Sequence, residues 1–385
     1  MLATSILTIF FLSSGCLGWE WGRSGKWDHK QRTNCHGGES TINYTTITGF
    51  FQQDDPATDS KTFDYTTTNY GLLNRSYLTG DELDPHGAWT QWERFTHFVD
   101  TLNRDADKNT QYKVLFMGRH GEGYHNAAES FYGTPAWNCY WGLLDGNTTT
   151  TWRDALLTPA GIAQCTKAHA FWSTSLSTSK IPAPQSYYSS PLLRSATTAN
   201  LTFAGLTLPA DRPFAPVVKE LLREGISIRA CDERSNRTHL RNVLPPEFIF
   251  EEGFTENDEL WRGDEGEGET SEAQVKRSKV VLDDIFSNDD ATWVSITSHS
   301  GEIAAILKVL GHRTFSLNTG QAIPVLVKAV NLKRGAATTT VQSWSTEATC
   351  STPPVTSITG QGCVCSSSAS LASVIATTTA TATSV

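Results

Sequence analysis

The sequence predicts a single α/β domain with a largely parallel central sheet flanked by helices. Between residues 112 and 330, short apolar runs with the length of buried strands alternate with segments whose apolar residues recur at helical spacing. Such alternation is typical of strand–helix–strand units with parallel strands. Two of the runs, 112–117 and 292–297, lead directly into a loop with a histidine. Polar residues at the carboxyl ends of such strands commonly bind ligands.

The elements are justified by pattern and by helix-start signals. The expected strands are short apolar runs, at 112–117, 187–188, 214–218, 292–297 and 323–330. The expected helices carry apolar residues on one face, at 89–103, 158–175, 192–203, 274–286 and, after Gly301, up to residue 310. Thr158 is a suitable N-cap, and Pro159 suits the first helical position of its helix.

Two segments between these elements have unusual compositions. Residues 131–152 are rich in aromatic residues, Gly and Asn, and we interpret them as a packed loop that covers the sheet end; the alternative is a wall of a substrate pocket. Residues 251–272 are strongly acidic, which favours a solvated surface loop, with a mobile lid as the alternative.

The two ends of the chain differ from the domain between them. Residues 1–18 hold an apolar run of about a dozen residues that ends in small ones, too short to span a bilayer and typical of a secretory signal peptide. The domain is expected over 19–337, with an irregular arm over 19–40. Residues 338–385 are Ser/Thr-rich and poor in large apolar residues, which predicts a disordered, O-glycosylated tail.

These features predict a secreted, extracellular glycoprotein. Sequons of the type Asn-x-Ser/Thr support this location, at Asn43, Asn74, Asn147, Asn200 and Asn236. No segment after residue 18 has the length and apolarity of a membrane span. The net charge of -9 argues against nucleic acid and anionic membranes as partners. Oligomeric state has no signature in the sequence.

Cysteines are too few to form the main scaffold. Removal of Cys16 with the signal peptide leaves an odd number, which allows at most three disulfides and one spare thiol. They are Cys35, Cys139, Cys165, Cys231, Cys350, Cys363 and Cys365. No spacing fits a zinc site, since Cys363 and Cys365 lie too close together in sequence. Neither a metal nor a cofactor is expected.

Three strand-to-loop junctions carry groups that suit a phosphoryl ligand. Arg119 and His120 follow the first strand, Arg194 lies in the first turn after the second, and His299 follows the strand at 292–297. In a parallel sheet such junctions share one edge, so we expect the four side chains to converge. Arginine matches phosphate oxygens with a planar fork of donors, and a histidine can attack phosphorus.

The motifs around these residues resemble those of the histidine phosphatase superfamily (branch 1), also called phosphoglycerate mutase-like. RHGEGYHN at 119–126 resembles the RHGxxxxN signature, and DALLTPAG at 154–161 resembles the DxxLTxxG element. SSPLLRSATTA at 189–199 and SHSG at 298–301 are similar to the second arginine and second histidine blocks. The resemblance covers about residues 112–302, and the segments GFFQQDDP and LGHRTFSLNTG are similar to fungal phosphomutase-like members.

The resemblance implies a role for each site residue. His120 would be the nucleophile that forms a phosphohistidine, and Arg119, Arg194 and His299 would bind the phosphoryl group, assisted by Asn126. The family also uses a carboxylic acid to protonate the leaving oxygen. Glu224 in LLRE matches best, and Glu233 in CDERS is the alternative.

One departure places the chain within the superfamily. Phytase-type members have an arginine and a proline after Arg-His-Gly and an aspartate after the second histidine. Here Glu122, Gly123 and Tyr124 follow Gly121, and Ser300 follows His299, as in the mutase-like branch.

The predicted function is therefore a secreted phosphatase that hydrolyses small phosphomonoesters through a phosphohistidine, over a catalytic domain of 19–337. The alternatives are a phosphoglycerate mutase-type phosphotransferase and a non-catalytic glycoprotein that binds a phosphorylated ligand. A secretion signal disfavours the mutase, because phosphoglycerates are intracellular.

Overall fold

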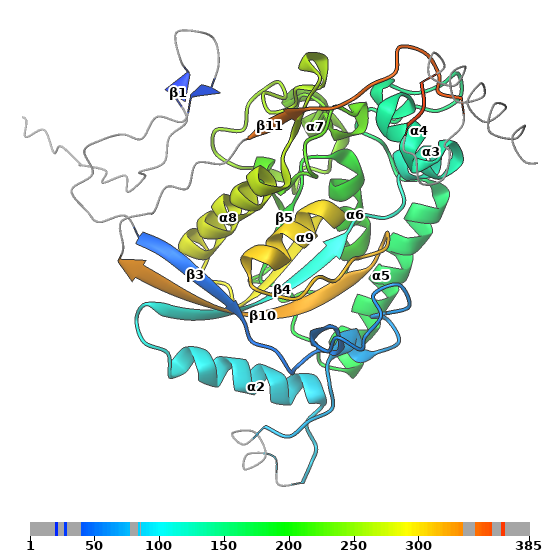
Figure 1. The fold of residues 1–385 in the computed structure, drawn as a ribbon. Helices are drawn as coiled ribbons and strands as arrows, with labels where there is room; N and C mark the ends of the chain where they lie inside the picture. The colour runs from blue at the N-terminus through cyan, green and yellow to red at the C-terminus, as the bar shows by residue number, and fades with distance from the viewer. Residues whose placement is uncertain are drawn as a thin grey trace, which may run out of the picture. The chain divides into compact units, whose positions relative to one another are not determined.

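A seven-stranded sheet forms the centre of the computed structural model, which describes residues 20–21, 27–28, 40–77, 84, 86–333, 343–355 and 363–365 (Figure 1). Its strands are, in spatial order, β3 (Ser40–Thr46), β10 (Ala322–Lys333), β4 (Thr110–Arg119), β9 (Trp293–Ser298), β5 (Ser186–Ser189), β6 (Val217–Val218) and β7 (Ile249–Phe250). From β4 to β7 every pairing is parallel, and β10 runs antiparallel to β4. The predicted α/β class with a largely parallel sheet is confirmed.

The chain divides into two compact units, 1–41 with 332–338, and 42–331 with 339–385. In the first unit, β1 (Glu20–Trp21) pairs antiparallel with β2 (Trp27–Asp28). The predicted signal peptide and Cys35 lie outside the described residues.

The predicted helices form in the second unit. They are α2 (Gln91–Arg104), α5 (Pro159–Thr178), α6 (Leu193–Phe203), α8 (Ser271–Asn288) and α9 (Ser300–Val309). Thr90 and Glu93 cap the start of α2 reciprocally, and the Thr158 hydroxyl accepts the Gly161 N–H at the start of α5, as its sequence predicts. None of the helices in the described ranges has the length and apolarity needed to cross a membrane.

Side chains of β4 show how the sheet is covered. The buried ring of Phe116 packs against Trp92 of α2 and Trp172 of α5, so these two helices lie on the same face. Helices α8 and α9 pack together on the opposite side from α2 (Figure 1). Removing a ring such as Phe116 from this core would cost about 3–5 kcal/mol.

The aromatic segment 131–152 is more regular than the predicted loop. It contains the end of α3 (Tyr124–Tyr132), then α4 (Thr134–Cys139) and the 3-10 turn η3 (Trp141–Leu143). Trp137 and Trp152 pack edge to face at 5.4 Å and form a small core of their own. Glycines and asparagines break the segment into short helices, whereas the interlocked rings hold these together.

The prediction of a disordered tail is wrong for residues 343–355 and 363–365. Strand β11 (Trp344–Thr346) pairs antiparallel with β8 (Glu267–Glu269), which lies inside the predicted acidic loop. Disulfides Cys139–Cys363 and Cys350–Cys365 tie this part of the chain to α4. Covalent bonds and backbone pairing replace the apolar core that the segment lacks.

Candidate active site

Three strand ends bring the predicted site residues to one edge of the sheet. Arg119, the last residue of β4, is the register partner of Ser298 on β9, and the His120 N–H donates to the Ser298 carbonyl at 3.0 Å. The next residue on each strand is a histidine, so the rings of His120 and His299 lie 4.9 Å apart and both are buried. The parallel register thus creates the convergence that the sequence predicts.

Glycines allow the motif loops to meet. A Cβ on Gly121 would lie 2.6 Å from the Gly161 carbonyl oxygen, inside van der Waals contact. The backbone of Glu122 leaves Gly161 equally little room for a side chain. The Arg-His-Gly loop and the start of α5 therefore pack backbone to backbone, which explains a glycine in both motifs.

Local contacts fix the tautomer of His120. Its Nδ1 lies 2.7 Å from the Gly121 carbonyl oxygen, which can only accept, so Nδ1 carries the proton and the lone pair is on Nε2. Burial, followed by the charges of Arg194 and Arg119, holds the pKa of His120 well below its ordinary value. The ring is therefore neutral, with its Nε2 lone pair available, even in mildly acidic solution.

Arg194 is fixed at the start of α6 by a buried carboxylate. Asp154 accepts the Leu193 N–H through Oδ1 at 2.8 Å and the Ser235 N–H through Oδ2 at 2.9 Å. Arg194 is 1% exposed, and its Nη1 donates to the Cys231 carbonyl at 2.7 Å. The aspartate of the DxxLTxxG element thus positions the second arginine of the site.

The cationic side chains retain unused hydrogen-bonding atoms. Arg119 donates from Nη1 to the Leu317 carbonyl at 2.8 Å, and His299 Nε2 lies 2.8 Å from the Ser190 hydroxyl. Three buried nitrogens of the cluster have no partner among the described residues, namely Arg119 Nε, Arg194 Nε and His299 Nδ1. A buried polar atom without a partner costs about 1–3 kcal/mol, a cost that an anionic ligand with several oxygens would relieve.

The two candidate proton donors lie in different surroundings. Glu224 accepts the N–H groups of Gly301 and Glu302, at 3.3 and 3.1 Å, in the first turn after His299. Its charge also raises the pKa of Arg119, although burial lowers that pKa more strongly. Glu233 instead forms an ion pair with Arg153. Of the two, Glu224 is the carboxylate that contacts the turn after His299.

Arg277 of α8 holds the backbone that carries Glu224. Its guanidinium donates to the Leu221, Arg223 and Glu224 carbonyls at 2.7, 3.0 and 3.0 Å. Arg277 also pairs with the buried Glu302 at 3.1 Å. The loop is therefore anchored by one buried arginine, although no part of it belongs to a long helix or strand.

Two residues at the start of α3, His125 and Asn126, add to the sequence interpretation. Asn126 accepts the Gly123 N–H through Oδ1 at 3.0 Å and so caps α3; a direct contact with a phosphoryl group stays a prediction. His125 was not predicted, yet its ring lies 5.4 Å from that of His120. Its place inside the RHGEGYHN motif was the available signal.

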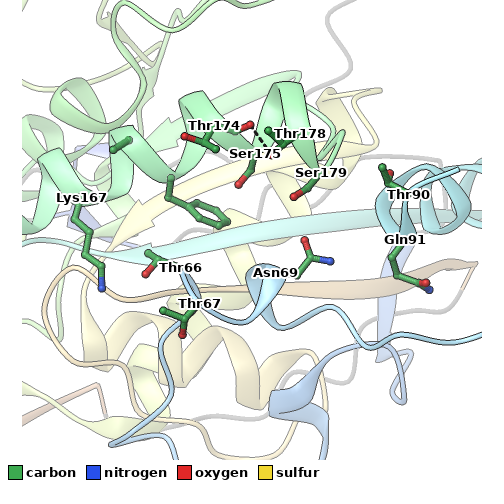
Figure 2. A pocket seen from close by; sticks show the side chains of 12 residues that line it. Thr66, Thr67, Asn69, Thr90, Gln91, Lys167, Thr174, Ser175, Thr178 and Ser179 are labelled. Atoms are coloured by element: carbon green, nitrogen blue, oxygen red, sulfur yellow. Dashed lines mark hydrogen bonds between the residues drawn. The ribbon is translucent and has the colours of Figure 1, made fainter. Parts of the chain in front are cut away.

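A wide depression in the described part of the chain lies away from this cluster. It has a volume of about 750 Å³ between the 66–69 turn, the start of α2 and the C-terminal half of α5 (Figure 2). Hydroxyl and amide side chains line it, and its cation Lys167 pairs with Asp64 at 2.7 Å. The lining holds neither arginine nor histidine, so we assign the chemistry to the buried cluster at the strand ends.

A group of three cysteines is close enough to hold a metal ion in the described part of the chain, namely Cys139, Cys350 and Cys363. The two disulfides use all three sulfurs. Oxidised cysteines offer no thiolate ligands, so the group does not fit a metal.

Comparison with known proteins identifies the family. The histidine phosphatase superfamily (branch 1) matches over residues 141–324, which include Arg194 and His299. The chain is 47% identical over 287 residues to a protein named "Probable phosphoglycerate mutase" from Arthroderma benhamiae, with 74% of this chain and 84% of the relative covered. The chain belongs to the histidine phosphatase superfamily.

Two further matches carry related names. "Phosphomutase-like protein 3" from Candida albicans is 39% identical over 220 residues, covering 57% of this chain and 66% of that protein. The crystal structure of a phosphoglycerate mutase from Thermus thermophilus matches at 22% identity with a TM-score of 0.30, covering 55% of this chain and 91% of that one.

Proposed function

We propose that the protein is a secreted phosphatase that hydrolyses small phosphomonoesters through a phosphohistidine on His120. The observation that carries the proposal is the state of His120. Its Nδ1 proton is tied to the Gly121 carbonyl, which leaves the Nε2 lone pair free beside the buried Arg194 and the half-buried Arg119. Family membership makes a phosphorylated substrate the natural ligand for this arrangement.

In the first step, His120 Nε2 attacks phosphorus and the P–O bond to the leaving alcohol breaks. Arg119, Arg194 and His299 stabilise the charge on the phosphoryl oxygens. The carboxylic acid of Glu224 gives its proton to the leaving oxygen, so the products are the alcohol, phosphohistidine and the Glu224 carboxylate.

In the second step, water attacks the phosphohistidine. Glu224 accepts a proton from that water, a new P–O bond forms, and the P–N bond breaks. Phosphate leaves, while His120 returns to its neutral form and Glu224 to its acid. The cycle uses only side chains of this chain and one water.

The proposed extracellular location rests on two features, the apolar run at residues 1–18 and the exposed sequons. Residues 1–18 have the pattern of a secretion signal, and the sequons at Asn43, Asn74, Asn147 and Asn236 are exposed in the structure. Asn200 is half-buried on α6, so we expect it to be modified less readily than the others. An external location would supply esters rather than glycolytic intermediates.

A phosphoglycerate mutase-type phosphotransferase is the second candidate. The name of the Arthroderma benhamiae relative favours it. The same phosphohistidine would then pass its phosphoryl group to a second hydroxyl rather than to water. A mutase of this kind needs a bisphosphorylated primer. The dependence of turnover on that primer therefore separates the two functions.

The test uses the full secreted chain and its His120→Ala variant. Both are assayed on a panel of phosphomonoesters from pH 4 to 8 with a chelator present, and on phosphoglycerate with and without a bisphosphorylated primer. We expect chelator-resistant hydrolysis that falls by more than about a thousandfold in the variant, because the covalent route is lost.

Other outcomes separate the alternatives. Isomerisation of phosphoglycerate that depends on the primer, without net release of phosphate, would establish the mutase. A folded wild-type protein that binds inorganic phosphate but turns over no ester would establish the non-catalytic binding protein.

A further inference from the structure

His125 is held firmly at the start of α3. It is the second residue of the helix, after the N-cap Gly123. Asn126 caps this end, and the Tyr124 N–H donates to the Leu156 carbonyl at 3.0 Å, which docks the turn onto the DxxLTxxG segment. The imidazole therefore stands on an anchored helix end rather than on a free loop.

The ring of His125 belongs to the nucleophile cluster by distance. It lies 5.4 Å from the ring of His120, compared with 4.9 Å between His120 and His299. A Cβ on Gly123 would lie 2.6 Å from His125 Nδ1 and 2.8 Å from its Cε1. Since Gly123 has an ordinary φ of -100°, its lack of a side chain serves to make room for this ring.

The hydrogen-bonding state of His125 leaves it ready for a ligand. The residue is 8% exposed, and its buried Nδ1 has no partner among the residues that the structure describes. Nε2 has no hydrogen bond to the described part of the chain either, and it is not among the fully buried atoms. Neither ring nitrogen is engaged by that part of the chain, so Nε2, the less buried of the two, can carry the ring proton to a ligand.

Burial and the nearby charges keep the imidazole of His125 neutral. Burial, and then the charges of Arg194, His120 and Arg119, hold the pKa of His125 well below its ordinary value. A neutral imidazole can donate one hydrogen bond to an anion without bringing another cation into a site that already holds two arginines. The unpaired nitrogen on His125 matches those on Arg119, Arg194 and His299.

We propose that His125 is a further catalytic residue, whose ring N–H donates to an oxygen of the phosphoryl group in the substrate and on His120. The inference rests on the proposed function, because the phosphoryl group is the ligand in both. It also assigns α3 a direct part in the reaction, in addition to its packing against the aromatic rings.

Two variants separate hydrogen bonding from packing. His125→Phe keeps an aromatic ring and removes the donor, whereas His125→Gln keeps an N–H donor. His169→Phe, on the half-buried face of α5 away from the cluster, is the matched control. Each is measured for kcat/KM on p-nitrophenyl phosphate and for binding of orthovanadate by calorimetry, after circular dichroism confirms folding.

We expect His125→Phe to lose about 10- to 100-fold in kcat/KM and in orthovanadate affinity, the range of a hydrogen bond to a charged group. His125→Gln should recover part of the loss, and His169→Phe should match the wild type. Wild-type values in a folded His125→Phe protein would overturn the proposal and leave His125 a packing residue. If the wild type itself neither hydrolyses the ester nor binds orthovanadate, the proposed function fails with it.

A measurement on the unaltered protein covers the case in which the variants do not fold. In ¹⁵N-histidine-labelled wild type, addition of inorganic phosphate should shift the ring signals of three histidines, His120, His125 and His299. A shift confined to two histidines would contradict the proposal.

Discussion

The floor and the rim of the site are built in different ways. The floor consists of the ends of β4, β5 and β9, the loop of Glu224 and the first turns of α3, α6 and α9, and it carries Arg119, Arg194 and both predicted histidines. The rim consists of the rest of α3 with α4, η3 and residues 343–355 and 363–365. Strand register fixes the floor, whereas stacked rings and two disulfides fix the rim.

This difference suggests that the floor carries the chemistry, whereas the rim stabilises the structure around it. Floor residues are adjacent across parallel strands, as Arg119 is to Ser298, so short motifs suffice to place them. The Cys139–Cys363 disulfide of the rim joins residues that are 224 positions apart. We therefore expect changes at floor residues that face the phosphoryl ligand to alter rates, and changes in the rim to alter stability first.

The largest expected effect compares a floor carboxylate with one beside the rim. Glu224→Gln should lower kcat/KM about 100- to 10,000-fold on esters with poor leaving groups, because a general acid is lost. Glu233→Gln breaks only an ion pair with the partly exposed Arg153 and should stay close to the wild type. Steady-state kinetics on alkyl and nitrophenyl phosphates decide between them.

The reverse result would reassign the general acid. If Glu233→Gln were the inactive variant and Glu224→Gln the active one, Glu233 would be the proton donor. The smaller loss expected for Glu224→Gln on nitrophenyl phosphate, whose leaving group needs little protonation, serves as an internal control.

An intermediate effect is expected from opening the rim. The double variant Cys139→Ser, Cys363→Ser should lower the free energy of unfolding by about 2–4 kcal/mol, since the unfolded chain loses a long cross-link. Activity per folded molecule should remain, because no floor residue changes. Urea unfolding and kinetics at low temperature measure the two quantities.

Cys165→Ala is the control for this experiment, since it removes a buried free thiol without breaking a disulfide. Equal stability of the double variant and the wild type would show that the tail does not stabilise the rim. Loss of activity in a fully folded double variant would show that the rim and the floor are coupled.

The smallest expected effect is a change in the free energy of unfolding with pH, caused by Glu302 in the first turn of α9. Burial, which outweighs the nearby Arg277, raises the pKa of Glu302 from 4.5 to about 7. The folded state then binds more protons than the unfolded state between these values. Stability should therefore fall as pH rises from about 4.5 to 7, by at most about 1.4 kcal/mol per pH unit.

Glu302→Gln cannot ionise and should flatten this part of the stability profile relative to the wild type. Urea unfolding at several pH values, with Glu259→Gln as a surface control, measures the difference. Parallel profiles for wild type and Glu302→Gln would contradict the assignment.

Much of the floor could be predicted from the sequence, and little of the rim. Strand β4 and the start of α5 have clear local signals, an apolar run and the Thr158–Pro159 pair. Glu224 and Glu233 could not be separated, because their positions depend on Arg277 and Arg153. His125 was missed because its burial depends on how α3 docks on Leu156.

The sequence by itself determined the α/β class, the family and the four phosphoryl-binding candidates, because apolar periodicity and glycine-flanked motifs act over a few neighbouring residues. Tertiary structure decided which carboxylate lies beside Arg119, that a third histidine joins the cluster, and that residues 343–355 and 363–365 are tied to α4. These three outcomes depend on contacts between distant segments, and such contacts leave no periodic signal in the chain.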